Sequence, residues 1–337
     1  MAKAIAQKYR SPICIVHTKA LERQATQRLG RTYTIQRLLR SGWPKGVTKP
    51  DLVVWDECHH SASDEWAKLA AMFPRAKILG LTATPQRADG RGLELFDRMV
   101  VAAQYSHLLE QGVIVPARVF VPEKELDGSD PDPVNAYTKY APRSRALFFL
   151  RRIADAEVAA RRLGPGHEPW HSAIPPKKRD RLMKAFRDGK LRALLTVDAL
   201  TEGLDVPGVQ TVVLSSPCQH VGTYLQRVGR GLRAFPGLDH MSLLDLCSAS
   251  LRHGSPTADR TYTIGGLGIG PAMPTLGVKR GSYTRIERGQ YDARLVEVHD
   301  WSSPVERQRA TARLRALAMS RGYPEKAVDE AARRLFG

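Results

Sequence analysis

The sequence has few cysteines, no long apolar run and a shortage of acidic residues. Its four cysteines, Cys14, Cys58, Cys218 and Cys247, form no Cys-x-x-Cys pair, which argues against a zinc knuckle and fits a reducing compartment. No apolar stretch approaches the roughly 20 residues of a membrane span, and the amino terminus lacks the apolar core of a signal peptide. These absences predict a soluble, cytoplasmic protein with no membrane partner.

Positive charge is present in large excess. The 337 residues contain 52 Lys and Arg against 34 Asp and Glu, which gives a formal net charge of +18. This excess is expected of a protein that binds phosphate backbones, and the alternative is a basic surface that only maintains solubility. The length is sufficient for two domains of ordinary size and a tail.

One apolar run passes directly into acidic residues. Residues 52–55 are typical of a buried parallel strand, and Asp56 and Glu57 follow it. Because open α/β sheets bind ligands at the carboxyl ends of their strands, Asp56 is a candidate ligand for Mg²⁺. Glu57 is a candidate to orient and deprotonate an attacking water. The alternative is a buried strand followed by a solvated acidic turn.

Polar side chains also follow two other predicted strands. Thr18 and Lys19 follow a strand at 13–16, where a phosphate contact and an ordinary turn are equally good interpretations. Thr82 and Thr84 follow another strand, where their hydroxyls could hydrogen-bond the neighbouring acidic pair.

An alternation of strand and helix patterns continues through the rest of the chain. It predicts strands at 145–150, 191–197 and 211–214 and helices at 154–163 and 177–187. Residues 123–142, rich in Pro, Asp and Gly, predict a loop or an insertion. Two short helices at 304–317 and 323–336 predict a basic appendage that adds duplex affinity, with a solvated tail as an equal alternative.

An arginine-rich segment carries regularly spaced polar side chains. Gln226, Arg230 and Arg233 share one helical face if the helix continues through Gly229 and Gly231. Arginines so placed form a rigid, permanently charged fork suited to a polyphosphate. A solvated basic face is the usual meaning of such a helix, but the two glycines favour close approach to a ligand.

Together these segments resemble the superfamily 2 helicases, specifically the DExH group of bacterial and phage helicases. The resemblance lies in five motifs, which follow in order over residues 11–250. They are motif Ia around Thr18, motif II at 56–59, motif III at 82–84, motif V at 202–207 and motif VI at 226–233.

The resemblance implies an α/β fold with two RecA-like parallel-sheet domains, ATP in the cleft between them and a nucleic-acid strand across their top. We expect an incomplete first domain at 1–115, a second domain at 116–255 and a connector with a small basic helical tail at 256–337. The implied cofactors are ATP and Mg²⁺. The implied partner is DNA, with RNA as the alternative.

The resemblance also implies roles for individual residues. Asp56 would hold Mg²⁺, Glu57 would direct the attacking water, and Arg230 and Arg233 would be arginine fingers. The implied catalytic residues are Glu57, Gln226, Arg230 and Arg233. The implied cofactor-binding residues are Asp56, Gly203 and Asp205. The implied residues for motif coupling are His59, Thr82 and Thr84. The implied nucleic-acid-binding residues are Thr18, Lys19, Gln36 and Thr196.

One motif of the family is not found in the sequence. The 337 residues contain no Gly-x-x-x-x-Gly-Lys-Ser/Thr, since Gly189-Lys190 is followed by Leu191 and preceded by Lys184 at the first glycine position. We therefore expect a first domain that lacks its first strand and its own phosphate-binding loop. Two functions remain open. One is an ATP-dependent helicase or translocase that takes the loop from an upstream segment or a second chain, and the other is an ATPase-inactive nucleic-acid-binding remnant.

Overall fold

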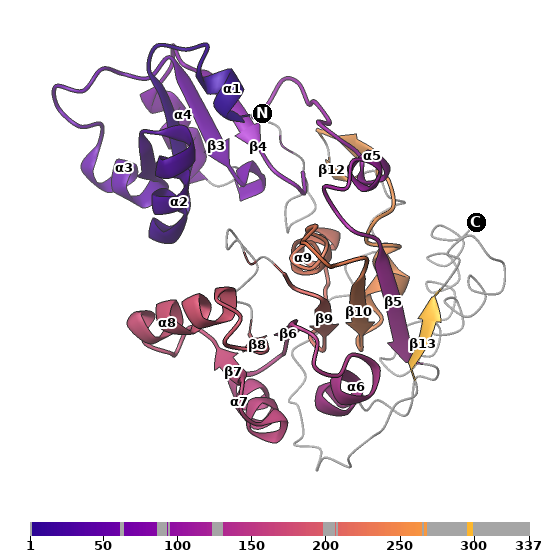
Figure 1. Ribbon diagram of the computed structural model, residues 1–337. Helices are drawn as coiled ribbons and strands as arrows, with labels where there is room; N and C mark the ends of the chain where they lie inside the picture. Colours follow the sequence, from indigo (N-terminus) through magenta and orange to yellow (C-terminus); the bar gives the residue numbers. More distant parts are fainter. Residues whose placement is uncertain are drawn as a thin grey trace, which may run out of the picture. The chain divides into compact units, whose positions relative to one another are not determined.

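The computed structural model describes residues 2–60, 64–85, 93, 95–122, 131–197, 206, 208–264, 266–267 and 295–298. These residues divide into two compact α/β units (Figure 1). Unit 1 contains residues 1–102 and 261–268, and unit 2 contains residues 103–260 together with the strand at 295–298. Within the described part, no helix is long and apolar enough to cross a membrane.

Unit 1 is built on a four-stranded parallel sheet of order β2-β1-β3-β4. The strands are β1 (Pro12–Val16), β2 (Thr32–Thr34), β3 (Leu52–Asp56) and β4 (Lys77–Leu81). The helices are α1 (Ala2–Ala6), α2 (Lys19–Leu29), α3 (Ile35–Ser41), α4 (Asp64–Met72) and the 3₁₀ helix η1 (Cys58–His60). Strand β3 lies between two parallel neighbours and is buried from Leu52 to Trp55, which explains its continuous apolar run. The strand predicted at 52–55 is confirmed.

The core of unit 1 gathers around two tryptophans. The ring centroids of Trp55 on β3 and Trp66 on α4 lie 4.6 Å apart. Trp66, Leu69 and Phe73 are all buried and belong to this core. Phe96 packs edge-on against Trp55, at 5.8 Å between centroids, so the segment after β4 also contributes to the support of β3.

Unit 2 is built on a seven-stranded sheet of order β13-β5-β10-β9-β6-β8-β7, in which β13 alone of these described strands runs antiparallel. The strands are β5 (Ala117–Pro122), β6 (Ala146–Phe149), β7 (His167–Trp170), β8 (Ala193–Thr196), β9 (Thr211–Leu214), β10 (Met241–Asp245) and β13 (Leu295–Val298). The helices are α5 (Tyr105–Glu110), α6 (Pro133–Tyr140), α7 (Ile153–Leu163), α8 (Pro176–Arg187), α9 (Val221–Val228) and α10 (Ala249–His253).

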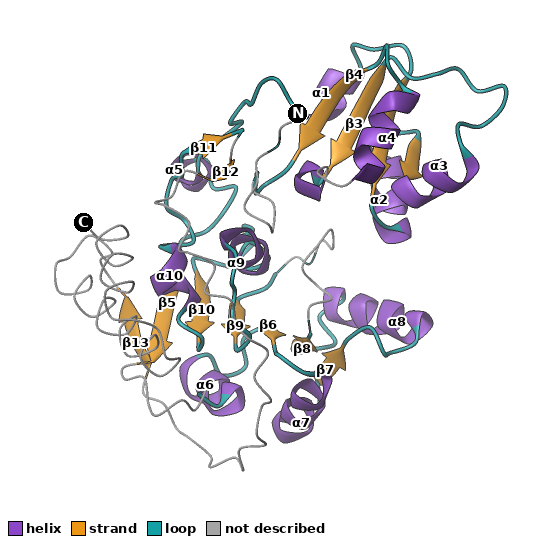
Figure 2. Ribbon diagram, turned by 180° about the vertical axis from the view of Figure 1, so that it is seen from behind, coloured by secondary structure: helices purple, strands orange, loops and turns teal. Residues whose placement is uncertain are grey.

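Helices cover both faces of the sheet of unit 2 (Figure 2). Leu147 and Phe149 face one core with residues of α8, α9 and α10, while Ala146 and Phe148 face the other core with residues of α6 and α7. This alternation along β6 is the period of two that places successive side chains on opposite faces. Unit 2 therefore has three layers, and the predicted α/β fold of two parallel-sheet domains is confirmed.

Several elements of unit 2 differ from the sequence-based expectation. Residues 123–142 were expected to form a loop or an insertion, and the helix α6 within them was not predicted. Asp132 caps the amides of Val134 and Asn135, and Pro133 stands in the first turn. Strand β7 was also missed. It contains Pro169 and lies at the edge of the sheet, where a missing backbone donor is tolerated. The predicted helical tail at 304–336 lies outside the described residues.

Of the three passages of the chain between the units, two lie after Ala102 and after Arg260. Inside unit 2 the two passages begin side by side. Gln104 donates from Nε2 to the carbonyl of Arg260 at 2.8 Å, and Asp259 accepts from the backbone N and the hydroxyl of Ser106 at 2.8 and 2.6 Å. Inside unit 1, the hairpin of β11 (Tyr262–Thr263) and β12 (Gly266–Leu267) accepts a hydrogen bond at Ile264 O from Leu93 N, at 2.6 Å.

Replacing Gly80 on β4 with alanine should destabilise unit 1. A Cβ at this position would lie 2.6 Å from Phe96 Cζ and 2.7 Å from Cys58 Sγ, so these side chains would have to move. Overpacking typically costs about 1–3 kcal/mol, which chemical denaturation would measure. In the Gly80→Ala background, Phe96→Leu should cost less stability than it does in the wild type. Equal costs in both backgrounds would contradict this packing.

Candidate active site

The carboxyl end of β3 presents the acidic pair of Asp56 and Glu57. Glu57 has a backbone φ of 52°. This value lies in the left-handed region, which residues other than glycine rarely adopt. The backbone N of Glu57 donates to Asp56 Oδ1 at 3.2 Å. Backbone strain of this kind is concentrated at functional sites, where the surrounding packing holds it in place.

Burial and mutual repulsion make the charge of this pair costly. Burial raises the pKa of Asp56 above its usual value, and the charge of Glu57 raises it further. A carboxylate in this position becomes more stable when a cation binds beside it. Asp56 therefore fits the oxygen chemistry that Mg²⁺ prefers, with Glu57 adjacent.

His59 joins the acidic pair to the segment after β4. Its Nδ1 lies 3.3 Å from Glu57 Oε2 and 3.0 Å from Thr82 Oγ1. The Thr82 hydroxyl donates its proton to the carbonyl of Thr84 and accepts from Thr84 N, both at 3.0 Å. Thr82 was expected to bond the acidic pair directly, and it instead reaches Glu57 through His59.

Thr84 contributes its backbone rather than its hydroxyl. The residue is 1% exposed, and among the described residues its Oγ1 has no hydrogen-bond partner. The segment 82–84 therefore meets His59 through one hydroxyl only, that of Thr82.

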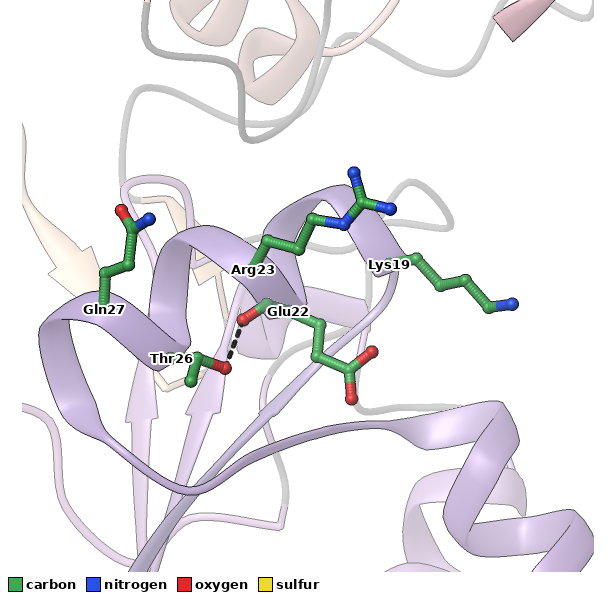
Figure 3. Close-up of a pocket in the computed structure, with 5 residues that line it drawn as sticks. All are labelled: Lys19, Glu22, Arg23, Thr26 and Gln27. Carbon is green, nitrogen blue, oxygen red and sulfur yellow. Dashed lines mark hydrogen bonds between the residues drawn. The ribbon is translucent and has the colours of Figure 1, made fainter. Parts of the chain in front are cut away.

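Thr18, Lys19 and Gln36 lie at the first turns of helices α2 and α3. The Thr18 hydroxyl caps α2 by accepting from Leu21 N at 3.3 Å, while Lys19 and Gln36 are exposed. Figure 3 shows Lys19 and Arg23 extending outward from α2 at a surface pocket of about 580 Å³. The remaining lining residues are Glu22, Thr26 and Gln27. The nucleic-acid role of Thr18, Lys19 and Gln36 stays a prediction.

Thr196 ends strand β8 inside unit 2. It is 0% exposed, and its hydroxyl has no hydrogen-bond partner among the described residues. Contact of this side chain with nucleic acid would require a rearrangement at the end of the strand. Two other expected site residues, Gly203 and Asp205, lie outside the described residues.

The arginine-rich segment does not form the single helical face that its spacing predicts. Helix α9 ends at Val228, so Gln226 is helical while Arg230 lies in the following turn. Arg233 is exposed and pairs with Ile114 in an isolated antiparallel bridge. Arg230, by contrast, is only 8% exposed. The expectation of one continuous helix is wrong.

The two glycines of this segment serve packing within the protein. A Cβ on Gly231 would lie 2.6 Å from Met241 Cγ and 3.0 Å from Val212 Cγ2. A Cβ on Gly229 would lie 2.7 Å from the carbonyl oxygen of Leu225. The glycines therefore let the chain turn closely over the sheet. The close approach was expected to be to a ligand, and it is to the core.

Arg227 has a structural role that the sequence analysis did not predict. It is 3% exposed, donates from Nη1 to the carbonyl of Ser216 at 3.0 Å, and lies over the Phe149 ring at 5.4 Å. These contacts fix α9 on the sheet next to Gln226 and Arg230. Asp245 was also missed. It is buried at the end of β10 and accepts from Ala249 N at 3.0 Å. The signal available in the sequence was an aspartate at the end of an apolar run, followed by Ser248 and Ser250 at a helix start.

The two ends of β3 give a test of the electrostatic cost of Asp56. The folded-state pKa of Asp56 is raised, so its carboxylate destabilises the fold at pH values above that pKa. Asp56→Asn should therefore raise the melting temperature at pH 7. The gain should shrink as the pH falls through the raised pKa, because the wild-type Asp56 then becomes protonated.

Asp51, next to the other end of β3, is the matched control. Burial raises its pKa, but the amides of Ser11 and Arg10, at 2.9 and 2.8 Å, outweigh this and lower it. Its contribution to stability is present above the unfolded pKa and is lost as the pH falls through the folded pKa. Asp51→Asn should therefore lower the melting temperature at pH 7. Thermal melts in which both variants shift in the same direction would refute this assignment.

Comparisons with known proteins agree with this geometry. Residues 3–87 match the family described as "Type III restriction enzyme, res subunit", and residues 132–235 match "Helicase conserved C-terminal domain". A "51.5 kDa protein" of a Lactococcus phage is 25% identical, with 69% of this chain and 59% of the relative covered. "Putative helicase 22" of a Sulfolobus islandicus filamentous virus is 28% identical, with 56% and 40% covered. The chain thus spans less than two thirds of the length of these relatives.

Solved structures show the same fold. The fragment of a putative HsdR subunit of a type I restriction enzyme from Vibrio vulnificus has a TM-score of 0.57 and 20% identity, with 73% of this chain and 55% of that chain covered. Dbp5 of S. cerevisiae, bound to RNA and ADP BeF3, has a TM-score of 0.53 and 17% identity, with 73% and 76% covered. With both family models matched in order and the acidic pair at the end of a central parallel strand, the chain belongs to the superfamily 2 helicases.

Proposed function

We propose that the chain is the core of an ATP-dependent nucleic-acid helicase or translocase of the DExH group. The observation that carries this proposal is the Glu57–His59–Thr82 arrangement, in which one imidazole nitrogen contacts a partly buried carboxylate and a hydroxyl at the ends of two neighbouring strands. Such an arrangement makes the position of Glu57 depend on the segment at 82–84. It suits a motor whose chemistry responds to its other ligands.

Asp56 and Glu57 divide the chemistry between them. Asp56, whose negative charge is partly buried, would hold Mg²⁺, directly or through water. Glu57 would orient a water molecule and accept its proton, with His59 Nδ1 lying 3.3 Å from its carboxylate. Magnesium-bound ATP supplies the phosphoryl group that the water attacks.

Unit 2 supplies permanent positive charge. Gln226, Arg230 and Arg233 are proposed to act in the same reaction, the arginines by stabilising charge on the transferred phosphoryl group. The two arginines differ in solvent exposure, which favours different roles for them. Arg233 presents its side chain at the surface, whereas Arg230 is held at 8% exposure beside the packed turn. Gly203 and Asp205 would complete the nucleotide contacts.

The partner polymer is proposed to be DNA, with RNA as the alternative. The net charge of +18 supports a polyanionic partner, and Lys19 and Gln36 are exposed at helix starts in unit 1. Binding of this kind should weaken steeply with salt, because each neutralised phosphate releases counterions.

Hydrolysis is proposed to need a phosphate-binding loop that these 337 residues do not contain. The loop would come from an upstream segment or from a second chain. Without it, no lysine lies on the β- and γ-phosphates and no hydroxyl binds Mg²⁺. The same observation favours a second candidate, a nucleic-acid-binding remnant with no ATPase activity.

Hydrolysis assays with and without an added loop test these proposals. Residues 1–337 should hydrolyse ATP at no measurable rate, and a chain extended by a strand and a Gly-Lys-Ser/Thr loop should show hydrolysis stimulated by nucleic acid. In the extended chain, Glu57→Gln should abolish turnover and leave ATP binding intact, whereas Glu65→Gln, an exposed control, should change neither. Arg230→Ala should lower turnover by a factor on the order of 10³.

Each failure has a distinct meaning. If residues 1–337 already hydrolyse ATP and Glu57→Gln removes that activity, the requirement for an added loop is wrong. If the extended chain binds single-stranded or forked nucleic acid but hydrolyses nothing, the remnant is the better description.

A further inference from the structure

Helix α8 and the turn after it hold an unusual concentration of positive charge. Residues 176–192 contain eight basic and two acidic side chains, which gives this stretch a net charge of +6. The basic residues are Lys177, Lys178, Arg179, Arg181, Lys184, Arg187, Lys190 and Arg192. Figure 1 shows α8 beside β7 and β8, at the end of the sheet opposite β13.

One face of α8 is anchored and the opposite face is exposed. Met183 and Phe186 are 5% and 0% exposed and belong to the core of unit 2. Lys177, Arg181 and Lys184 follow the spacing of four and three residues, lie opposite this buried face and are exposed. The three positions extend over roughly 10 Å of helix. The exposed face therefore carries a straight row of cations.

The first turn of α8 contradicts the charge preference of a helix, although Lys184 and Arg187 in its last turn follow it. The amino-terminal end of a helix has a partial positive charge, which favours acidic residues, yet the first turn of α8 has none and contains Lys177 and Lys178. Helix α7, in the same unit, follows the rule, with Asp155 in its first turn and Arg161 and Arg162 in its last. A local rule broken without compensation is expected where a function requires it.

Little in the surrounding structure neutralises this charge. Lys184 Nζ contacts Asp188 Oδ2 at 2.7 Å, and the Arg179 guanidinium lies 5.7 Å from the Trp170 ring centroid. Among the described residues, no acidic side chain pairs with Lys177, Lys178 or Arg181. Cations three and four residues apart repel one another, so this arrangement is destabilising unless an anion binds.

We propose that the exposed face of α8 binds the phosphate backbone of the nucleic acid on which the protein acts. This inference rests on the proposed helicase function and adds a contact surface outside the family motifs. A row of mostly lysine charges suits backbone contact without base reading, because each ammonium is a point charge with rotatable donors. The surface thus contributes affinity and salt dependence rather than sequence preference.

A charge-neutralising variant with a matched control tests the proposal. Lys177→Gln, Lys178→Gln and Arg181→Gln would be combined in one chain, and Lys68→Gln, Arg75→Gln and Lys77→Gln, all exposed in unit 1, would be combined in another. Both chains lose three positive charges. Fluorescence anisotropy with labelled single-stranded and duplex DNA, over a series of NaCl concentrations, gives the dissociation constants.

The α8 variant should bind about tenfold or more weakly at low salt. Its log–log salt slope on single strands should be smaller by roughly 2, since each lost phosphate contact contributes about 0.7. The control variant should keep most of the wild-type slope. Equal slopes for the two variants would overturn the proposal and leave α8 as a solvated face or one that contacts an acidic protein.

Two further measurements separate the possible failures. The α8 variant should melt at or above the wild-type temperature, because it removes like charges from the first turn of the helix. A lower melting temperature with weaker binding would indicate a structural role and count against the proposal. If the wild-type chain itself binds no nucleic acid, the proposed function fails together with this inference. If the wild-type chain binds nucleic acid but the two variants have equal salt slopes, this inference fails while the proposed helicase function stands.

Discussion

The structure depends on keeping two adjacent carboxylates at the partly buried end of a central strand. Parallel neighbours bury β3 on both sides, and the chain must leave it at Asp56 and Glu57. The cost appears in the raised pKa of Asp56 and the left-handed backbone of Glu57. His59 offsets part of this cost, because its charge lowers the pKa of Asp56. A bound cation would offset the electrostatic part of the cost, because an opposite charge stabilises the ionised carboxylates.

Packing within unit 2 holds in place the backbone that carries long cationic side chains. Close packing of Gly231 on Met241 and Val212 fixes the turn after α9, and buried Arg227 fixes the helix itself. Arg230 and Arg233 therefore start from a rigid backbone although they share no helical face. Less side-chain and backbone freedom has to be lost when such groups meet a phosphate.

The basic residues of the chain are placed differently in different helices. In α7 the charges at both ends follow the helix dipole, while in α8 the lysines of the first turn oppose it. This contrast between two helices of one unit separates ordinary surface charge from charge retained against local stability. The net charge of +18 alone makes no such distinction.

The sequence by itself determined the strand at 52–55 and the acidic pair at its end, because this signal lies in residues that are adjacent in the chain, and the resemblance of its motifs implied the α/β fold class. It also predicted that 82–84 would lie near that pair. Only the tertiary structure decided that Thr82 reaches Glu57 through His59, because the contact joins residues 23 positions apart. It also decided that α9 stops at Val228 and that Gly231 packs against Met241 on a neighbouring strand. Contacts between distant segments leave no periodic signal, so spacing alone could not predict them.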